Sequence, residues 1–249
     1  MSDLKKTFNR RAETYDRIRP GYPDALIEDV TALSGIPEDG RILEIGCGTG
    51  QATLQFASRG FYMDCIDIGC DLVAIVSDKL RGYSKVQVVV SSFEDLDSGG
   101  KLYDLIIAAT SFHWIDPDVA YVKSSSLLKS SGALAVFSNT HAGKNDGFFA
   151  EVQKVYQIFA PSVTGSAKKA TAIQPECFEE PVSLCYPWSV EYTTEQYLDL
   201  LSTYSDHISL PETDRNALFA GIAGLINDKY DGRVLKNYES VLNLRKKKD

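Results

Sequence analysis

The sequence predicts an α/β fold built on a doubly wound, mostly parallel sheet with helices on both faces. Two observations predict it. Between residues 22 and 138, near-continuous apolar runs that suit buried parallel strands alternate with helical segments. The first apolar run, 41–45, leads into a loop with glycine at three alternate positions, which a helix follows. The 249 residues suffice for one large domain of this kind with a small lid.

The first part of the chain supplies the strands and helices of this sheet. Its first helix opens with Pro23 and Asp24 in the first turn, as helices often do. The run Val-Gln-Val-Val-Val-Ser is rich in the β-branched residues typical of strands, and a Ser-Ser-Gly turn precedes the last apolar run. The predicted order is helix 22–34, strand 41–45, helix 51–58, strand 61–68, helix 72–79, strand 86–91, strand 102–109, helix 122–128 and strand 133–138.

Beyond residue 140 the alternation changes, which indicates a second structural region. Residues 160–180 are rich in Ser, Thr, Ala and Pro, and we expect a mobile or lid-like segment there. Apolar periodicity on either side of this segment favours further helices and strands. The predicted order is helix 148–159, strand 184–192, helices 194–203 and 212–226, and strand 233–244.

The composition limits the class of protein and the compartment. A hydrophobic fraction of 44% and a charged fraction of 24% are ordinary for a soluble globular protein. No apolar run reaches the roughly 18 residues of a membrane span, and the N-terminus lacks the apolar core of a secretory signal. We therefore expect a cytoplasmic protein with no membrane partner.

Cysteine, histidine and net charge each argue against a class of partner. The five cysteines form no C-x-x-C pair and the three histidines are scattered, so neither a disulfide framework nor a metal site is predicted. A net charge of −8 disfavours nonspecific binding to phosphate backbones, and no nucleic-acid partner is expected. The basic run at residues 245–248 is predicted to be a solvated tail.

The segment 41–51, Arg-Ile-Leu-Glu-Ile-Gly-Cys-Gly-Thr-Gly-Gln, holds the densest functional signal. Its strand carries one acidic residue, Glu44, and ends in Gly46, Gly48 and Gly50. Glycine allows positive φ and a close approach to the backbone, and the following helix offers free N–H groups. This pattern suits a bulky polar cofactor that lies against the chain.

The glycine segment is also compatible with a structural turn or, as a competing cofactor motif, with a dinucleotide-binding loop. A glycine triplet after a strand can be only a tight turn into a helix, with Cys47 as a small filler residue. The dinucleotide fingerprint needs G-x-G-x-x-G/A, and its third position falls on Gln51 or Thr53, depending on the first glycine counted. The fingerprint therefore fails in both registers.

An acidic residue near the end of the second predicted strand indicates a second cofactor contact. Asp67 follows Gly46 by 21 residues and precedes Ile68. In a doubly wound sheet this position lies beside the crevice where ligands bind, and a carboxylate there can accept both ribose hydroxyls of a nucleoside. Nicotinamide enzymes use the same device, so Asp67 indicates a nucleoside cofactor without identifying it. An N-cap for the helix near Asp71 is the structural alternative.

Residues 44–50 resemble the E/D-x-G-x-G-x-G motif of the class I S-adenosylmethionine-dependent methyltransferases. Residues 8–23 are similar to the F-x-x-x-A-x-x-Y-D-x-x-R-P-x-Y-P start of a bacterial and archaeal, type 11-like branch of that family. Residues 103–107 resemble the family's fourth-strand motif, and 192–197 and 200–205 also look like this branch. The resemblance thus covers nearly the whole chain. It implies a Rossmann-like, seven-stranded, mostly parallel sheet whose last strand is antiparallel.

The resemblance also implies S-adenosyl-L-methionine as cofactor, S-adenosyl-L-homocysteine as product, and no metal. It implies that the N-terminal segment is a flap over the cofactor. Tyr15 and Arg19 would lie near the methionine end of the cofactor, with Arg19 paired with the methionine carboxylate. The implied cofactor-binding residues are Tyr15, Arg19, Glu44, Gly46, Cys47, Gly48, Gly50, Asp67, Ile68, Ser92, Phe93, Glu94, Ala109, Thr110, His113 and Trp114.

One position departs from the family pattern. Ser92 stands where the family usually has the acidic residue that holds the adenine amino group. Phe93 is expected to pack on the adenine face, with a buried core phenylalanine as the alternative, and Glu94 or Asp95 could replace the missing carboxylate. The N/D-P-P-Y motif of N6-adenine methyltransferases and the Pro-Cys nucleophile of cytosine-C5 enzymes are absent.

Methyl transfer from a sulfonium is an in-line displacement at an activated carbon, so the protein mainly aligns the acceptor and excludes water. A base is needed only where the acceptor must lose a proton, and His113 and His141 are the catalytic candidates, with structural roles as the alternative. The rings of Tyr15, Phe112 and Trp114 are expected near the sulfonium.

Taken together, the sequence predicts one methyltransferase domain over 1–249. It comprises an N-terminal flap (1–23), a cofactor-binding core (24–140), and an acceptor or lid region with the closing strands (141–249). A small-molecule acceptor is favoured because no recognition domain is appended. The alternatives are a protein or RNA methyltransferase, a non-catalytic S-adenosylmethionine-binding or regulatory protein, and, more distantly, a hydride-transferring dehydrogenase.

Overall fold

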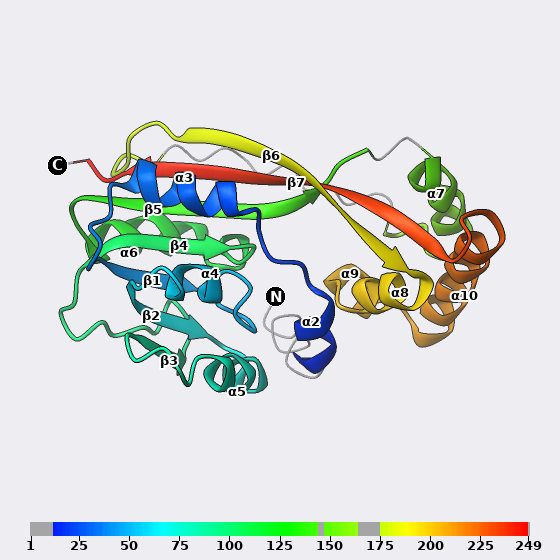
Figure 1. Ribbon diagram of the computed structural model, residues 1–249, viewed down its shortest axis with the longest axis horizontal. Helices are drawn as coiled ribbons and strands as arrows, with labels where there is room; N and C mark the ends of the chain where they lie inside the picture. The colour runs from blue at the N-terminus through cyan, green and yellow to red at the C-terminus, as the bar shows by residue number, and fades with distance from the viewer. Residues whose placement is uncertain (1–11, 144–146, 164–174, 249) are drawn as a thin grey trace.

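A single seven-stranded sheet runs through the part of the chain that this computed structural model describes, residues 12–143, 147–163 and 175–248 (Figure 1). Its order is β3-β2-β1-β4-β5-β7-β6. β7 is antiparallel to both neighbours, whereas the strands from β3 to β5 pair in parallel. The predicted Rossmann-like sheet with an antiparallel last strand is therefore confirmed. The strands are β1 Arg41–Ile45, β2 Tyr62–Asp67, β3 Val86–Val90, β4 Tyr103–Ala109, β5 Leu128–His141, β6 Val182–Thr193 and β7 Arg233–Lys246.

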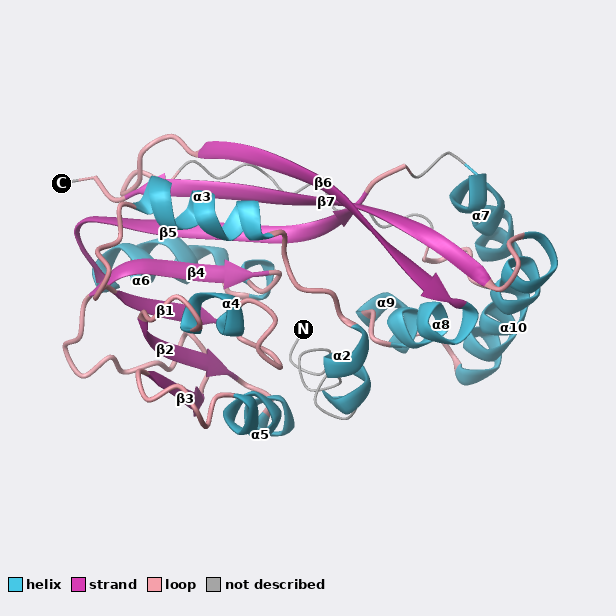
Figure 2. Cartoon of the chain, in the orientation of Figure 1, coloured by secondary structure: helices cyan, strands magenta, loops and turns pink. Residues whose placement is uncertain are grey.

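The helices are drawn in cyan in Figure 2, and two of them begin at side-chain caps. The side chain of Asp116 accepts a hydrogen bond from the Asp118 N–H, and Pro117 occupies the first turn of α6. Thr193 and Gln196 form a capping box at the start of α8. The helices are α2 Ala12–Ile18, α3 Asp24–Ser34, α4 Thr53–Ala57, α5 Cys70–Lys79, the 3-10 helix η2 Phe112–Trp114, α6 Pro117–Leu127, α7 Gly147–Phe159, α8 Thr194–Ser202, α9 Ser205–Ile208 and α10 Glu212–Lys229.

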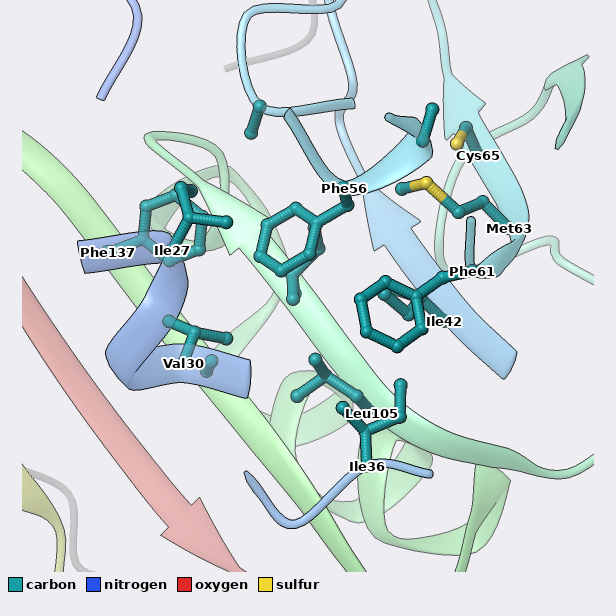
Figure 3. Packing of buried hydrophobic residues seen from close by; sticks show 14 of the residues in the cluster. Ile27, Val30, Ile36, Ile42, Phe56, Phe61, Met63, Cys65, Leu105 and Phe137 are labelled. Atoms are coloured by element: carbon teal, nitrogen blue, oxygen red, sulfur yellow. The ribbon is translucent and has the colours of Figure 1, made fainter. Parts of the chain in front are cut away.

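Helices cover both faces of the parallel part of the sheet. Side chains alternate along each strand, so Ile42 packs with α3, α4 and α5, whereas Leu43 packs with α6 on the other face. Figure 3 shows the face of the sheet that α3 and α4 cover. The ring of Phe56 in α4 lies beside Ile27 of α3, with Phe137 of β5 close by. These packed layers hold the carboxyl ends of the parallel strands in fixed positions.

The long strands β6 and β7 extend beyond the parallel strands and carry a helical lobe (Figure 1). There α7, α8 and α10 pack on the strand ends, including Tyr192. Between the lobe and the sheet lies α2, in which Asp16 forms an ion pair with Lys79 of α5 and Arg17 pairs with Asp199 of α8 at 2.6 Å. The helix α2 is thus tied to both halves of the molecule.

Two predicted elements begin five residues too late, and the short helix α9 was not predicted. The helix predicted at 122–128 begins at Pro117, because the Asp116 side chain caps the helix and Pro117 occupies its first turn. The strand predicted at 133–138 runs from Leu128 to His141. Its Ser-Ser-Gly segment, which was predicted as a turn, lies within the strand as an irregularity, with Ser131 at a φ of 60°.

The predicted solvated tail at 245–248 is wrong. Arg245 and Lys246 belong to β7, and the Lys246 ammonium donates to the carbonyl of Ser34 at the end of α3. Lys247 Nζ donates to the carbonyl of Leu128 directly after α6, at 2.8 Å. Cations favour the carbonyl end of a helix, so these lysines complete two helix ends instead of facing solvent as a free tail.

The lid-like segment predicted at 160–180 falls largely on residues 164–174, which lie outside the described residues. Just after them, Phe178 is fully buried and bridges to Lys247. Within the described ranges, no helix is both long and apolar enough to cross a membrane.

Candidate active site

The glycine loop after β1 has a backbone shape that requires glycine. Gly46, Gly48 and Gly50 have φ values of +70°, +56° and +93°, a region that residues with a Cβ rarely adopt. A Cβ on Gly46 would lie 2.5 Å from Ser111 Cβ, and one on Gly50 would lie 2.7 Å from Val76 Cγ2. The loop is therefore packed tightly against α5 and the turn after β4.

We expect Gly50→Ala to lower the free energy of unfolding by about 2–4 kcal/mol, because it combines a left-handed backbone with a clash against Val76. Urea denaturation measures the loss. The matched control is Gly60→Ala, since Gly60 has a φ of +87° but nothing within 4 Å of the added Cβ. The control should lose only about 1–2 kcal/mol. Equal losses in the two variants would contradict the tight packing of the loop.

Asp67, at the end of β2, is fixed by the backbone on both sides of the crevice. Its Oδ2 accepts from the Gly48 N–H at 2.9 Å and its Oδ1 from the Gly69 N–H at 2.8 Å. Burial raises the pKa of Asp67, although these backbone N–H groups and that of Ile68 act against the rise. The N-cap alternative is wrong, because α5 begins at Cys70 after Gly69 and has no side-chain cap.

Glu44 lies beneath the glycine loop and is 1% exposed. Burial raises its pKa to about 7, with the nearby Thr53 hydroxyl and Cys65 thiol acting against the rise and Asp67 adding to it. Oε2 accepts from Cys65 Sγ at 3.6 Å, while Oε1 has no hydrogen-bond partner among the described residues. Glu44 and Cys47 line a small cavity of about 70 Å³. A buried polar atom beside a cavity is the kind of group that a ligand or water satisfies.

The turn after β4 holds a strained residue. Thr110 has a φ of 59°, which is rare for a β-branched side chain. Its N–H donates to the Phe137 carbonyl at 2.8 Å, and its hydroxyl lies 2.8 Å from that of Tyr22. Strain of this kind costs about 1–3 kcal/mol and is concentrated at functional sites. The neighbouring Ser111 hydroxyl donates to the Ile45 carbonyl and so joins this turn to the glycine loop.

A cleft of about 980 Å³ lies between the sheet and the helical lobe. It brings together fourteen of the residues predicted from the sequence. They are Tyr15, Arg19, Gly46, Gly48, Asp67, Ile68, Ser92, Phe93, Glu94, Ala109, Thr110, His113, Trp114 and His141. Of the other three, Glu44 and Cys47 line the small cavity, and Gly50 lies against Val76.

The side chains after β3 shape the end of the cleft where adenine is expected. The Ser92 hydroxyl donates to Asp95 Oδ2 at 2.7 Å and accepts from the Asp95 N–H at 3.0 Å, so it closes a turn. Phe93 lines the cleft although it is only 3% exposed, so the cofactor and core interpretations of this residue are compatible. Of the two carboxylates that the sequence left open, Glu94 lines the cleft and Asp95 does not.

Arg19 joins the end of α2 to the helical lobe. Its Nε and Nη2 donate to the Oγ1 and the carbonyl of Thr203, at 2.9 and 2.8 Å. The guanidinium also lies over the rings of Tyr15, at 4.9 Å, and Tyr204, at 4.4 Å. An arginine carries five N–H donors, so these contacts orient the group and leave other donors for an anion in the cleft.

The two histidines predicted as bases occupy different environments. His113 is exposed in η2, with its ring 4.9 Å from that of Trp114, and partial desolvation lowers its pKa. His141 ends β5, where its Nδ1 lies 2.8 Å from the ammonium of Lys236. An ammonium can only donate, so it occupies the Nδ1 lone pair. A catalytic role for either histidine stays a prediction.

The helical lobe supplies cleft residues that sequence reasoning did not single out. Those on helices have the spacing of ordinary core residues, and Lys236 and Tyr238 lie on β7. Tyr197 and Tyr204 fall in segments that resemble the family branch, but the resemblance gave them no role in the site. Only the packing of the lobe against the sheet brings them to the cleft. They are Phe149, Tyr156, Tyr197, Tyr204, Asp206, His207, Lys236 and Tyr238.

Comparisons with known proteins agree with this geometry. A family model described as a methyltransferase domain matches residues 42–132. An uncharacterised methyltransferase-like protein of Schizosaccharomyces pombe is 27% identical over 222 residues, which cover 86% of this chain and 84% of that protein. The chain belongs to the class I S-adenosylmethionine-dependent methyltransferases. This methyltransferase is also 22% identical over 209 residues to an uncharacterised methyltransferase of Mycobacterium tuberculosis, covering 84% and 81% of the two chains.

A further relative of the methyltransferase has a named acceptor. The malonyl-[acyl-carrier protein] O-methyltransferase of Geobacter sulfurreducens is 26% identical over 176 residues, covering 68% of this chain and 62% of that protein. Among solved structures, a putative type II methyltransferase from Anaeromyxobacter dehalogenans has a TM-score of 0.66 at 22% identity, covering 91% of this chain and 97% of that one. That likeness shows the shared fold.

The described part of the chain also bears on whether a metal ion could bind. In those residues, no group of three or more His, Cys, Asp or Glu could hold a metal ion.

Proposed function

We propose that this methyltransferase transfers the methyl group of S-adenosylmethionine to a small molecule by in-line displacement. The observation that carries the proposal is the cleft of about 980 Å³, which joins the predicted cofactor residues to an aromatic wall on the helical lobe. Its size falls within the range of small-molecule sites. Tyr15 of α2 lines the cleft, and α2 is tied to both α5 and α8, so the site favours an acceptor that fits a partly enclosed space.

The residues present fit the cofactor. Gly46 and Gly48 line the cleft, and a Cβ on Gly46 would collide with Ser111, so the loop is a cradle without side chains. Asp67 accepts two backbone N–H groups and keeps further lone pairs for hydroxyl donors. Glu44 has an unsatisfied buried oxygen under the same loop. These are the features that a nucleoside with a charged amino-acid tail requires.

When bound, S-adenosylmethionine supplies a methyl carbon already activated on a sulfonium. In this proposal Asp67 holds the ribose hydroxyls, Glu94 and Phe93 contact the adenine, and Arg19 pairs with the methionine carboxylate. The rings of Tyr15 and Trp114 present π faces to the positive charge. The helix α2 limits the access of water, and the lobe orients the acceptor.

A protein-bound acceptor is the second candidate, because the Geobacter relative is named for acting on malonyl-acyl carrier protein. The contacts of α2 disfavour it for this chain. Arg17 pairs with Asp199 and Arg19 binds Thr203, so α2 is held against the lobe beside the cleft, where it restricts access for a large acceptor. A free small molecule does not need an open docking surface beside the cleft.

The test is calorimetric titration with S-adenosylmethionine and S-adenosylhomocysteine, with NAD as the negative control. We expect both sulfur nucleosides to bind and Asp67→Ala to weaken binding by about 100-fold, since two charge-assisted hydrogen bonds are lost. The matched control is Asp78→Ala, which removes an exposed carboxylate of α5 that pairs with Arg81. Binding of NAD instead, or no binding by folded protein, would overturn the cofactor assignment.

A further inference from the structure

Three side chains on the wall of the helical lobe form a hydrogen-bonded chain. Tyr156 of α7 and His207 of α9 are 51 residues apart, yet the Tyr156 hydroxyl lies 2.6 Å from His207 Nε2. His207 Nδ1 lies 2.7 Å from Asp206 Oδ1, and the His207 backbone N–H donates to the same oxygen at 2.8 Å. All three residues line the cleft. None of them is needed for the cofactor contacts proposed above.

The order of the chain fixes the direction in which a proton can move. An ionised carboxylate only accepts, so Asp206 assigns the proton of His207 to Nδ1 and leaves Nε2 as the acceptor for the Tyr156 hydroxyl. Burial alone would raise the pKa of Asp206, but its hydrogen bonds and charge interaction with His207 lower it, which keeps the carboxylate ionised. This is the logic of a carboxylate that orients a histidine so that the histidine can accept a proton from a hydroxyl.

Among the three residues, Tyr156 alone carries a hydroxyl at the cleft wall. Asp206 also lines the cleft, with its side chain 52% exposed, but its Oδ1 is occupied by His207. The side chain of His207 is 4% exposed, and the rings of Tyr156, Tyr204 and Phe219 pack around it, with centroids at 5.6, 5.7 and 6.3 Å. The titratable groups that face the imidazole are Tyr156 from α7, Tyr204 from the turn before α9, and Asp206. His207 therefore acts through the Tyr156 hydroxyl.

The rest of this wall indicates the class of acceptor. Phe149, Tyr197, Tyr204 and Tyr238 line the same half of the cleft, and such rings favour a planar aromatic partner. Lys236 lies under this wall, with its Nζ 4.7 Å from the ring centre of Tyr238. A cation there stabilises a developing oxyanion and disfavours an ammonium-bearing acceptor.

We propose that Tyr156 is the catalytic residue that takes the proton of an aromatic hydroxyl acceptor, with His207 and Asp206 as the residues that position and recharge it. The inference rests on the proposed methyl transfer. The acceptor O–H gives its proton to Tyr156 Oη while the Tyr156 proton passes to His207 Nε2. The acceptor oxygen forms the new C–O bond, the C–S bond breaks, and its electron pair stays on sulfur. His207 then loses the added proton to solvent by way of Asp206, which it contacts at 2.7 Å and whose side chain is 52% exposed.

The test uses two chromophoric phenols, 4-nitrophenol and 7-hydroxycoumarin, with the full chain and S-adenosylmethionine. Methylation removes the absorption or fluorescence of the phenolate and gives a continuous assay. We expect turnover with at least one of the phenols, and a loss of about 100-fold in kcat for both Tyr156→Phe and His207→Gln. Tyr62→Phe, a change at a half-exposed tyrosine on β2 outside the cleft, is the matched control and should leave kcat unchanged.

Two further readouts separate catalysis from folding and from the cofactor assignment. Each variant is first titrated with S-adenosylmethionine, and unchanged affinity shows that the fold and the cofactor half are intact. In the complex with S-adenosylhomocysteine, the bound phenol should be more ionised in the wild type than in His207→Gln at the same pH, an effect that a purely structural role would not produce. The inference is overturned if the wild type binds S-adenosylmethionine but turns over neither phenol, or if both variants keep the wild-type rate. Failure to bind S-adenosylmethionine would instead overturn the proposed function.

Discussion

Replacing Phe56 by alanine is expected to lower the free energy of unfolding by about 3–5 kcal/mol, the usual cost of truncating a buried aromatic ring. Phe56 is fully buried, and it is the large side chain by which the short helix α4 joins the layer between α3 and the sheet (Figure 3). Neighbouring helices are fixed by their own contacts, so the cavity cannot collapse completely. Chemical denaturation followed by circular dichroism measures the change.

The position of α4 gives this core substitution a functional consequence. The helix begins at Thr53, directly after the glycine loop, so a loosened α4 also releases the cradle. We expect Phe56→Leu to lose only about 1–2 kcal/mol, because part of the volume remains. The exposed control Val122→Ala on α6 should stay within about 0.5 kcal/mol of the wild type. A loss as small as that of the control in Phe56→Ala would show that α4 does not depend on this ring.

The parallel half of the fold could be predicted because its signals are local. The run at 86–91 and the strand before the glycines carry their apolar pattern within a few residues, and the structure places β3 and β1 there. The start of α6 was predicted too late because its N-terminal signal consists of only two residues, Asp116 and Pro117, which also occur in turns. The fate of Lys246 and Lys247 depends on carbonyls more than a hundred residues away, which no local pattern can reveal.

The candidate site divides in the same way. Gly46, Gly48 and Asp67 belong to a motif whose spacing alone indicates a nucleoside site. Tyr156 and His207 occupy positions that look like ordinary helical core, and their contact exists only because α7 and α9 pack together at the end of β6 and β7. The proposed acceptor site therefore depends on tertiary packing, whereas the proposed cofactor residues could be found from short spacings along the chain.

The free energy of unfolding of the wild type is expected to fall by about 3 kcal/mol as pH rises, and Glu44→Gln should remove most of that fall. The pKa of Glu44 rises from 4.5 to about 7 on folding, because the carboxyl is buried. Below a pH of 4.5, Glu44 is protonated in both the folded and the unfolded protein, so it adds no pH dependence to the free energy of unfolding. Between the two values the unfolded chain ionises first, so stability falls as pH rises, and above about 7 the loss is complete. Asp67, whose pKa is also raised, contributes in the same direction.

Denaturation of the ligand-free protein at about pH 4 and about pH 8 measures this effect, since those conditions lie on either side of the two pKa values of Glu44. The wild type should lose stability between them, and Glu44→Gln should lose much less. Glu38→Gln, at an exposed position, should behave as the wild type does. An equal pH dependence in all three proteins would show that Glu44 is not protonated in the free fold.

The proposed function explains why a carboxyl that destabilises the free fold is retained. The ammonium and sulfonium of bound S-adenosylmethionine favour its ionised form. Calorimetry in buffers of different ionisation enthalpy should then detect proton release on binding in the wild type and less in Glu44→Gln.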